Sequence, residues 1–171
     1  MFISPIAAID NGWIKGDFSH ENVQPNAIDF TLDVLFSIDD TKTFTIGKDH
    51  KKMRGGEKLK PVVDSRDNVE YWRLSPQTCY DGMSDFYVTL PEGVACMTII
   101  RSTLNRNGIF ITSGLYDSGY EGHIGFAIHN NSGFALIEPG TRVGQLIFVQ
   151  ADSDGLYEGG YNHTEGSHHA D

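Results

Sequence analysis

The chain has 171 residues, of which 39% are hydrophobic and 21% are charged, and its formal net charge is −10. This length is enough for one domain with its own core. The acidic balance excludes a protein that coats nucleic acid, because neutralising many phosphates needs a basic surface. A single triphosphate needs only a few well-placed donors. No apolar run approaches the ~18 residues of a membrane span, so we expect no membrane partner.

The first residues and the cysteines indicate a compartment. The opening stretch MFISPIAAIDNGW lacks the basic and apolar regions of a signal peptide. Cys79 and Cys96 lie apart without metal-like spacing, and we interpret them as free thiols in a reducing cytoplasm. For a protein of viral origin this would be the host cytoplasm.

Strands are predicted along most of the chain. Runs rich in Ile, Val, Phe and Thr recur between Gly, Pro, Asn and Asp residues, a pattern typical of strands. In chain order these runs are 27–38, 85–90, 95–100, 108–112, 122–128, 134–138 and 143–150. Their number and spacing predict an all-β fold, either a distorted β-barrel, a sandwich or a jelly roll.

The remaining segments are polar or short. The lysine-rich stretch 48–70 is predicted to be a surface excursion. One short helix is expected at 101–108, with Ser102 or Thr103 as its cap and Gly108 at its end. Residues after 150 are polar, glycine-rich and without periodicity. We therefore predict a β domain over 1–150 and a flexible C-terminal arm over 151–171.

Familiar signatures of other nucleotide and metal enzymes are missing from the sequence. It contains no His-x-Glu followed by Pro-Cys-x-x-Cys, which zinc-dependent deaminases need. It contains no Walker loop, no dinucleotide-binding glycine fingerprint and no HExxH zinc motif. His168 and His169 are predicted to be solvated at the terminus rather than to bind a metal.

Five motifs in a fixed order carry a resemblance. They are QPNAIDFTLD (24–33), LPEGVACMTIIRSTLNRNGI (90–109), GLYDSGYEGHIGFAIHN (114–130), PGTRVGQLIF (139–148) and EGGYNHTEG (158–166). The ordered set resembles the homotrimeric dUTPase/dCTP deaminase family. The resemblance implies a distorted β-barrel or jelly roll of the trimeric dUTPase type. It also implies a deoxynucleoside triphosphate as partner and active sites shared between the subunits of a homotrimer.

The second motif is predicted to hold the phosphates. A guanidinium, a hydroxyl and the start of a helix favour an anion, and the resemblance assigns this work to Arg101 and Ser102. Thr103 and Arg106 are placed at the substrate with them. An arginine is missing from the terminal motif, so either the charge stabilisation of the phosphates is weaker or another residue, such as Arg106, supplies it.

The first and fourth motifs are expected to support the same site. Asp29 matches an aspartate that supports the active site or metal-bound waters. Gln145 matches a glutamine that donates to phosphate oxygens. A side-chain amide between apolar neighbours in a strand is usually buried, so some group must form a hydrogen bond with it. Arg142 is interpreted as a residue of structural or interfacial ion pairs.

The third and fifth motifs are predicted to hold the reacting water, the sugar and the base. Asp117 matches the carboxylate that activates water for attack on the α-phosphate. Tyr120 matches the tyrosine beneath the deoxyribose, and Leu115 is placed at the substrate. Tyr161 matches the aromatic residue that stacks over the base when the arm closes. The resemblance implies Mg²⁺ held through substrate phosphates and waters rather than directly by protein ligands.

Two positions favour phosphate hydrolysis over deamination. Deaminases of this family use a glutamate whose place falls on Ala127, and an alanine cannot move protons. Gln145 is typical of the dUTPases. The first two motifs nevertheless resemble the deaminases more closely, so the chain combines a deaminase-type framework with diphosphatase-type chemistry.

Three departures from the family pattern keep alternatives open. The segment 108–117, whose hairpin backbone reads the base, is about two residues shorter than usual. The terminal motif has no arginine, which weakens charge stabilisation at the phosphates. Gly119 stands where dUTPases commonly have Asp. We predict hydrolysis of a deoxynucleoside triphosphate, foremost dUTP, to dUMP and pyrophosphate. The alternatives are a dCTP deaminase, a diphosphatase for dCTP or a modified pyrimidine, and a non-catalytic regulatory trimer that binds nucleotide.

Overall fold

The computed structural model describes residues 1–162. Residues 163–171 lie outside this part, so the end of the predicted arm, with His168 and His169, is not described. In chain order the elements are α1 (Pro5–Asp10), β1 (Ile14–Lys15), η1 (His20–Asn22), β2 (Ile28–Thr31), β3 (Val34–Ser37), β4 (Thr45–Ile46), β5 (Lys51–Lys52), β6 (Val62–Asp64), β7 (Val69–Leu74), β8 (Thr78–Thr89), β9 (Val94–Ile100), α2 (Ser102–Arg106), β10 (Ile109–Thr112), β11 (Glu121–Asn130), β12 (Ala135–Ile137) and β13 (Arg142–Gln150).

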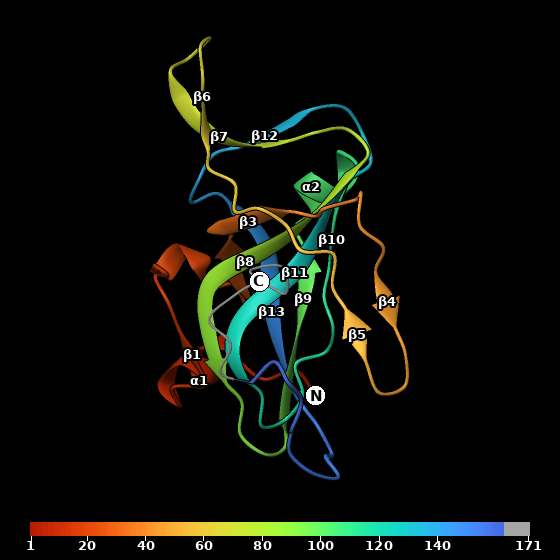
Figure 1. The fold of residues 1–171 in the computed structure, drawn as a ribbon. Helices are drawn as coiled ribbons and strands as arrows, with labels where there is room; N and C mark the ends of the chain where they lie inside the picture. Colours follow the sequence, from red (N-terminus) through yellow and green to blue (C-terminus); the bar gives the residue numbers. More distant parts are fainter. Residues whose placement is uncertain (163–171) are drawn as a thin grey trace.

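The predicted all-β fold is confirmed. Two antiparallel sheets form the body of the molecule, one with the order β1-β8-β11-β10 and with β3 also paired to β8, the other with the order β2-β13-β9. A third sheet, β12-β7-β6, and the small β4–β5 hairpin project from this body (Figure 1). The sheets do not close into one ring, so the architecture is an open, distorted barrel.

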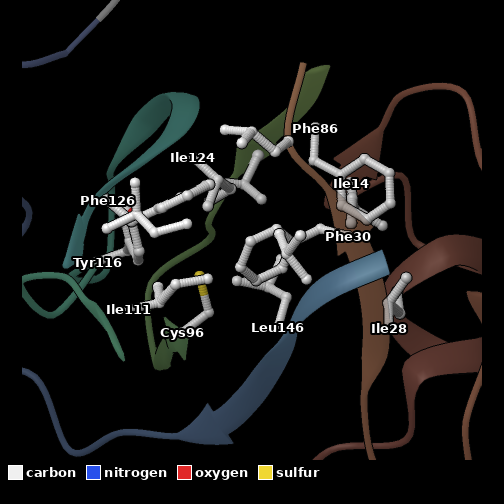
Figure 2. Close-up of a cluster of buried hydrophobic side chains, with 14 of the residues drawn as sticks. Ile14, Ile28, Phe30, Phe86, Cys96, Ile111, Tyr116, Ile124, Phe126 and Leu146 are labelled. Carbon is white, nitrogen blue, oxygen red and sulfur yellow. The ribbon is translucent and has the colours of Figure 1, made fainter. Parts of the chain in front are cut away.

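The core lies between the two main sheets, as the alternation along their strands dictates. In β11 every second residue from Gly122 to Asn130 is buried, and in β8 the even-numbered residues from Tyr80 to Val88 are buried. Phe30 of β2 and Phe126 of β11 meet across the interface with ring centroids 5.2 Å apart. Figure 2 shows these rings among the buried side chains of both sheets. Gly144 is required opposite Phe30, because a Cβ there would overlap the ring.

Two short α-helices are present within residues 1–162, rather than the single predicted helix. The sequence analysis missed α1, which has only six residues and begins with Pro5. The second helix, α2, falls where predicted, and Gly108 follows it with a positive φ of 79°. The predicted cap is wrong, because the N-cap is Arg101 and no side chain caps the helix.

The lysine-rich stretch 48–70 is largely a surface segment, as predicted, although it contains three short strands or parts of strands. Lys51 and Lys52 of β5 and Val62 and Val63 of β6 are exposed. Within the part of the chain that the structure describes, no helix has the length and apolar character needed to cross a membrane.

Candidate active site

A buried charge cluster joins three of the predicted site residues. Asp29 lies in β2 with only 2% of its side chain exposed. Its Oδ2 lies 2.7 Å from Nη1 of Arg101 and 3.4 Å from Nη1 of Arg142. Its Oδ1 accepts a 2.9 Å hydrogen bond from the side-chain amide of Gln145. The carboxylate is therefore paired and hydrogen-bonded, which a buried charge requires.

The sheet register explains why these residues meet. Gln145 is the direct cross-strand partner of Asp29 in the β13–β2 pair and of Ile99 in the β13–β9 pair. Directly paired residues project from the same face of a sheet. Arg101 follows β9 by one residue and reaches back to Asp29. The group that bonds the Gln145 amide is thus Asp29.

The two arginines play different structural parts. The ion pair with Asp29 confirms the interpretation of Arg142 as an ion-pair residue. Arg142 also donates to the backbone oxygen of Glu21 at 2.6 Å. About a third of the Arg101 side chain stays exposed. Its guanidinium has donors beyond the one on Asp29, so Arg101 is anchored by a carboxylate and still able to bind an anion.

The remaining side chains of the phosphate motif follow Arg101 along the chain and lie at the surface. Ser102, Thr103 and Arg106 lie on α2 and are exposed. Because α2 has five residues, little more than one turn, its dipole adds little. Anion binding at this end of the molecule must rest on the side chains.

Asp117 lies in a different place, in the turn after β10. Its side chain is exposed and lines a pocket of about 560 Å³ together with Leu115. The C-terminal segment supplies the other acidic groups of this pocket, Asp152, Asp154 and Glu158. None of the described residues that line it is basic. This pocket of a single chain therefore repels a triphosphate unless cations are added.

Tyr120 is packed in the core beside this turn, with 7% of the residue exposed. Its ring contacts Tyr116 and Tyr157, with centroids 5.1 and 5.7 Å away. Its hydroxyl donates to the backbone oxygen of His123 at 2.8 Å. Burial raises the pKa of Tyr120 to about 12, so the hydroxyl remains a donor at neutral pH and fixes the start of β11.

The described part of the predicted arm lies against its own chain. The Tyr157 amide donates to Ser118 and the Glu121 amide donates to Asn162. Tyr161 accepts a 3.1 Å hydrogen bond from Lys51 of β5, whose ammonium also lies 4.6 Å from the ring centroid. The ring predicted to stack on a base is therefore held at the β4–β5 hairpin.

Within one chain, Asp117 and Arg101 lie at opposite ends of β9. Tyr116 pairs with Cys96 near the start of β9, which places Asp117 at that end, whereas Arg101 follows the other end (Figure 1). From Cys96 to Arg101 the extended strand spans about 17 Å. A general base must lie within hydrogen-bond reach of the reacting water. Asp117 and Arg101 of the same chain do not fit around one phosphate.

A second pocket contains a residue that the sequence analysis missed. Asp81 lies in β8 beside Ala127 of β11, and Ala127 in turn pairs with Thr112 of β10. All three line a pocket of about 360 Å³. Asp81 is buried, and its charge helps burial to raise the pKa of the neighbouring Cys79 thiol. An aspartate inside a strand would have indicated a functional position in the sequence. The run around Asp81 was not predicted to be a strand, so this indication was missed.

The sequence matches the family model described as dCTP deaminase-like over residues 6–151. A probable deoxyuridine 5'-triphosphate nucleotidohydrolase of Methanopyrus kandleri is 30% identical over 149 residues, covering 85% of this chain and 90% of the relative. A dCTP deaminase, dUMP-forming, of Bifidobacterium adolescentis is 32% identical over 168 residues, covering 96% and 84%.

Solved structures share the fold. The 2'-deoxycytidine 5'-triphosphate deaminase from Agrobacterium tumefaciens superposes with a TM-score of 0.67 at 16% identity. The match covers 88% of this chain but 48% of that one, so this chain spans about half its length. A variant of the Staphylococcus bacteriophage 80alpha dUTPase with dUpNHpp gives a TM-score of 0.52 at 16% identity, covering 88% and 83%.

Proposed function

The chain belongs to the dCTP deaminase-like family, and we propose that it hydrolyses pyrimidine deoxynucleoside triphosphates, foremost dUTP, to the monophosphate and pyrophosphate. Two relatives bear the names of dUTP nucleotidohydrolase and dUMP-forming dCTP deaminase. Ala127 in place of the deaminase glutamate supports hydrolysis at phosphorus rather than at the base.

The observation that carries the proposal is the division of charge between the ends of β9. The acidic pocket around Asp117 offers a general base without phosphate ligands. The Asp29 cluster offers an anchored guanidinium without a general base. Each supplies what the other lacks, so a working site needs Asp117 of one chain beside Arg101 of another. We infer a homotrimer with shared sites.

An apolar surface supports this self-association. The face of β9 and β13 that carries Gln145 also carries Met97, Ile99 and Ile147, because Met97 pairs with Ile147 and Ile99 pairs with Gln145. Ile99 is 45% exposed. Met97 is half-buried and Ile147 is already buried in the single chain, so the exposed apolar area of this face is centred on Ile99. An exposed apolar side chain on an outer sheet face favours contact with another copy of the chain.

In the proposed reaction Asp117 accepts a proton from water as the water attacks the α-phosphate, and pyrophosphate leaves. Arg101, held by Asp29, stabilises the negative charge on the phosphate oxygens, with Ser102, Thr103 and Arg106 beside it. We place Leu115 and Tyr120 on the sugar side of the turn. The arm after residue 150 then covers the site, with Tyr161 over the base, and excludes water.

The donors around Asp117 fit Mg²⁺. Carboxylate oxygens suit this ion, which keeps most of its waters in proteins, and Asp117, Asp152, Asp154 and Glu158 line one pocket. No group of three or more His, Cys, Asp or Glu within residues 1–162 is arranged to hold a metal directly. When bound through phosphates and waters, Mg²⁺ would offset the negative charge of the triphosphate and so reduce its repulsion by these carboxylates.

A substrate panel tests the proposal. The protein is incubated with Mg²⁺ and each deoxynucleoside triphosphate, and nucleotides, pyrophosphate and ammonia are measured separately. We expect dUTP to give equal amounts of dUMP and pyrophosphate. Ammonia from dCTP without pyrophosphate would establish a deaminase instead. Binding without any product would establish a regulatory nucleotide-binding protein.

A further inference from the structure

The pocket around Asp81 lies on the outer side of the main sheet. In β8 the even-numbered residues from Tyr80 to Val88 are buried in the core, so Asp81 points the other way. Its cross-strand partner Ala127 lies on the same outer side of β11. Met53, from the segment that follows β5, and Ile38, after β3, line the pocket with them. These side chains cover Asp81 and leave it 8% exposed.

One carboxylate oxygen of Asp81 has no hydrogen-bond partner among residues 1–162. Its Oδ2 is buried, and no described residue donates a hydrogen bond to it. A buried carboxylate oxygen without a donor is costly to the folded protein. A protein can retain such a carboxylate when a bound ligand supplies the missing donor, because the gain in function then outweighs the loss of stability.

The composition of the pocket favours an N–H donor over a metal ion. Asp81 is the one acidic residue among the described residues that line it, and the others are apolar, glycine or hydroxyl-bearing. A divalent cation needs several oxygen ligands with more than one charge. A flat apolar ring with a single polar edge matches these walls and the volume of about 360 Å³.

The pocket adjoins the proposed catalytic turn. Ser113 and Gly114 line the Asp81 pocket, and Leu115 and Asp117 line the acidic pocket. Asp117 lies four positions after Ser113, at most about 14 Å along an extended chain. A nucleotide whose α-phosphate lies at Asp117 is long enough to place its base beside Ser113 and Asp81.

We propose that Asp81 is a specificity-determining residue that accepts a hydrogen bond from the exocyclic amino group of a cytosine-type base. This inference rests on the proposed nucleotide site. An ionised carboxylate accepts well from the 4-amino group of cytosine. The one N–H on the pairing edge of uracil lies between two carbonyl oxygens, which repel the carboxylate. Asp81 therefore raises the affinity of the site for dCTP relative to dUTP.

Binding of non-hydrolysable α,β-imido analogues of dCTP and dUTP, with Mg²⁺, tests the assignment. Calorimetry compares the unmodified protein with Asp81→Asn and Asp81→Leu. The side-chain amide introduced by Asp81→Asn presents an N–H to the 4-oxygen of uracil, so this variant should shift the dCTP-to-dUTP affinity ratio toward dUTP by roughly tenfold or more. Asp81→Leu should weaken dCTP binding by a similar factor. Asp85→Asn, on the same face of β8 but outside the pocket, should leave the ratio unchanged.

The melting temperature distinguishes a role of Asp81 in base recognition from a purely structural role. Because Oδ2 has no donor to lose, the melting temperature of ligand-free Asp81→Asn should equal or exceed that of the unmodified protein. A lower melting temperature with an unchanged affinity ratio would overturn the assignment. If both analogues bind and the ratio is the same in every variant, the Asp81 assignment fails. The proposed hydrolysis is then decided separately, by pyrophosphate release from dUTP with the unmodified protein. If the ratio shifts but no triphosphate is hydrolysed, the assignment stands and the proposed function fails.

Discussion

Replacing Asp117 with asparagine should lower the turnover of dUTP by about 100- to 10,000-fold, the usual contribution of a general base. The affinity for the triphosphate should change little, because asparagine has the same shape and removes one negative charge from an already acidic pocket. The measurement is kcat from pyrophosphate release, together with the Kd of the α,β-imido analogue. An unchanged kcat would exclude Asp117 as the base.

The same pocket offers a matched control for this experiment. Asp154 is exposed and lines the pocket with Asp117, but it comes from the C-terminal segment. Asp154→Asn makes the same chemical change and the same change of charge. We expect kcat to fall less than tenfold in this variant. Equal losses in the two variants would indicate a general effect of pocket charge rather than proton transfer by Asp117.

Removing the buried carboxylate of Asp29 should have the largest effect on stability. Asp29→Ala leaves the Gln145 amide without its acceptor and two guanidiniums without their counter-charge. Breaking a buried ion pair costs about 3–5 kcal/mol, and because both arginines are about one-third exposed and can hydrate, we expect a loss of about 3 kcal/mol. The free energy of unfolding in urea gives this value.

A surface aspartate provides the comparison for Asp29. Asp39 pairs with Lys42 at 3.1 Å, and both side chains are accessible to solvent, so Asp39→Ala should leave the unfolding midpoint nearly unchanged. The unfolding midpoint of Asp29→Asn should lie between those of Asp29→Ala and Asp39→Ala, because the introduced amide oxygen still accepts a hydrogen bond from Gln145. If Asp29→Ala unfolded at the same urea concentration as Asp39→Ala, the cluster would have no structural role.

Much of the fold follows from patterns along the chain. The run 143–150 is rich in branched apolar side chains, and it forms all but the first residue of β13 (Arg142–Gln150). The first half of β8 was missed because Asp81, Gly82 and Ser84 interrupt its apolar residues. These residues are tolerated there for tertiary reasons: Gly82 makes room for the Phe126 ring, and Asp81 faces a pocket. Both reasons are tertiary contacts, which a local sequence pattern does not reveal.

Three of the predicted site residues could be grouped from the sequence, but their arrangement could not. The motifs placed Asp29, Arg101 and Gln145 in one site, and the structure brings these three together. That Asp29 binds the other two depends on the register of β2, β13 and β9, which joins positions far apart in the sequence. The separation of Asp117 from Arg101 depends on where Tyr116 pairs along β9. Sequence motifs do not encode that distance.

The most direct test of the shared site is complementation between two inactive variants. Asp117→Asn removes the base, and Arg101→Gln removes the phosphate ligand while its amide still donates to Asp29. The variants carry different tags, are unfolded and refolded together, and the mixed oligomers are isolated by both tags. Refolding each variant alone provides the baseline.

If each site combines Asp117 of one chain with Arg101 of a neighbour, some sites in mixed oligomers contain both native residues. For random assembly of equal amounts into trimers, about one quarter of all sites are intact, so the unfractionated refolded mixture should regain roughly a quarter of the native kcat for dUTP hydrolysis. The mixed trimers isolated by both tags have one intact site in three and should regain about a third. If both residues served one site within a single chain, every site would lack one of them. Activity in the mixture no higher than that of either variant alone would contradict the shared site.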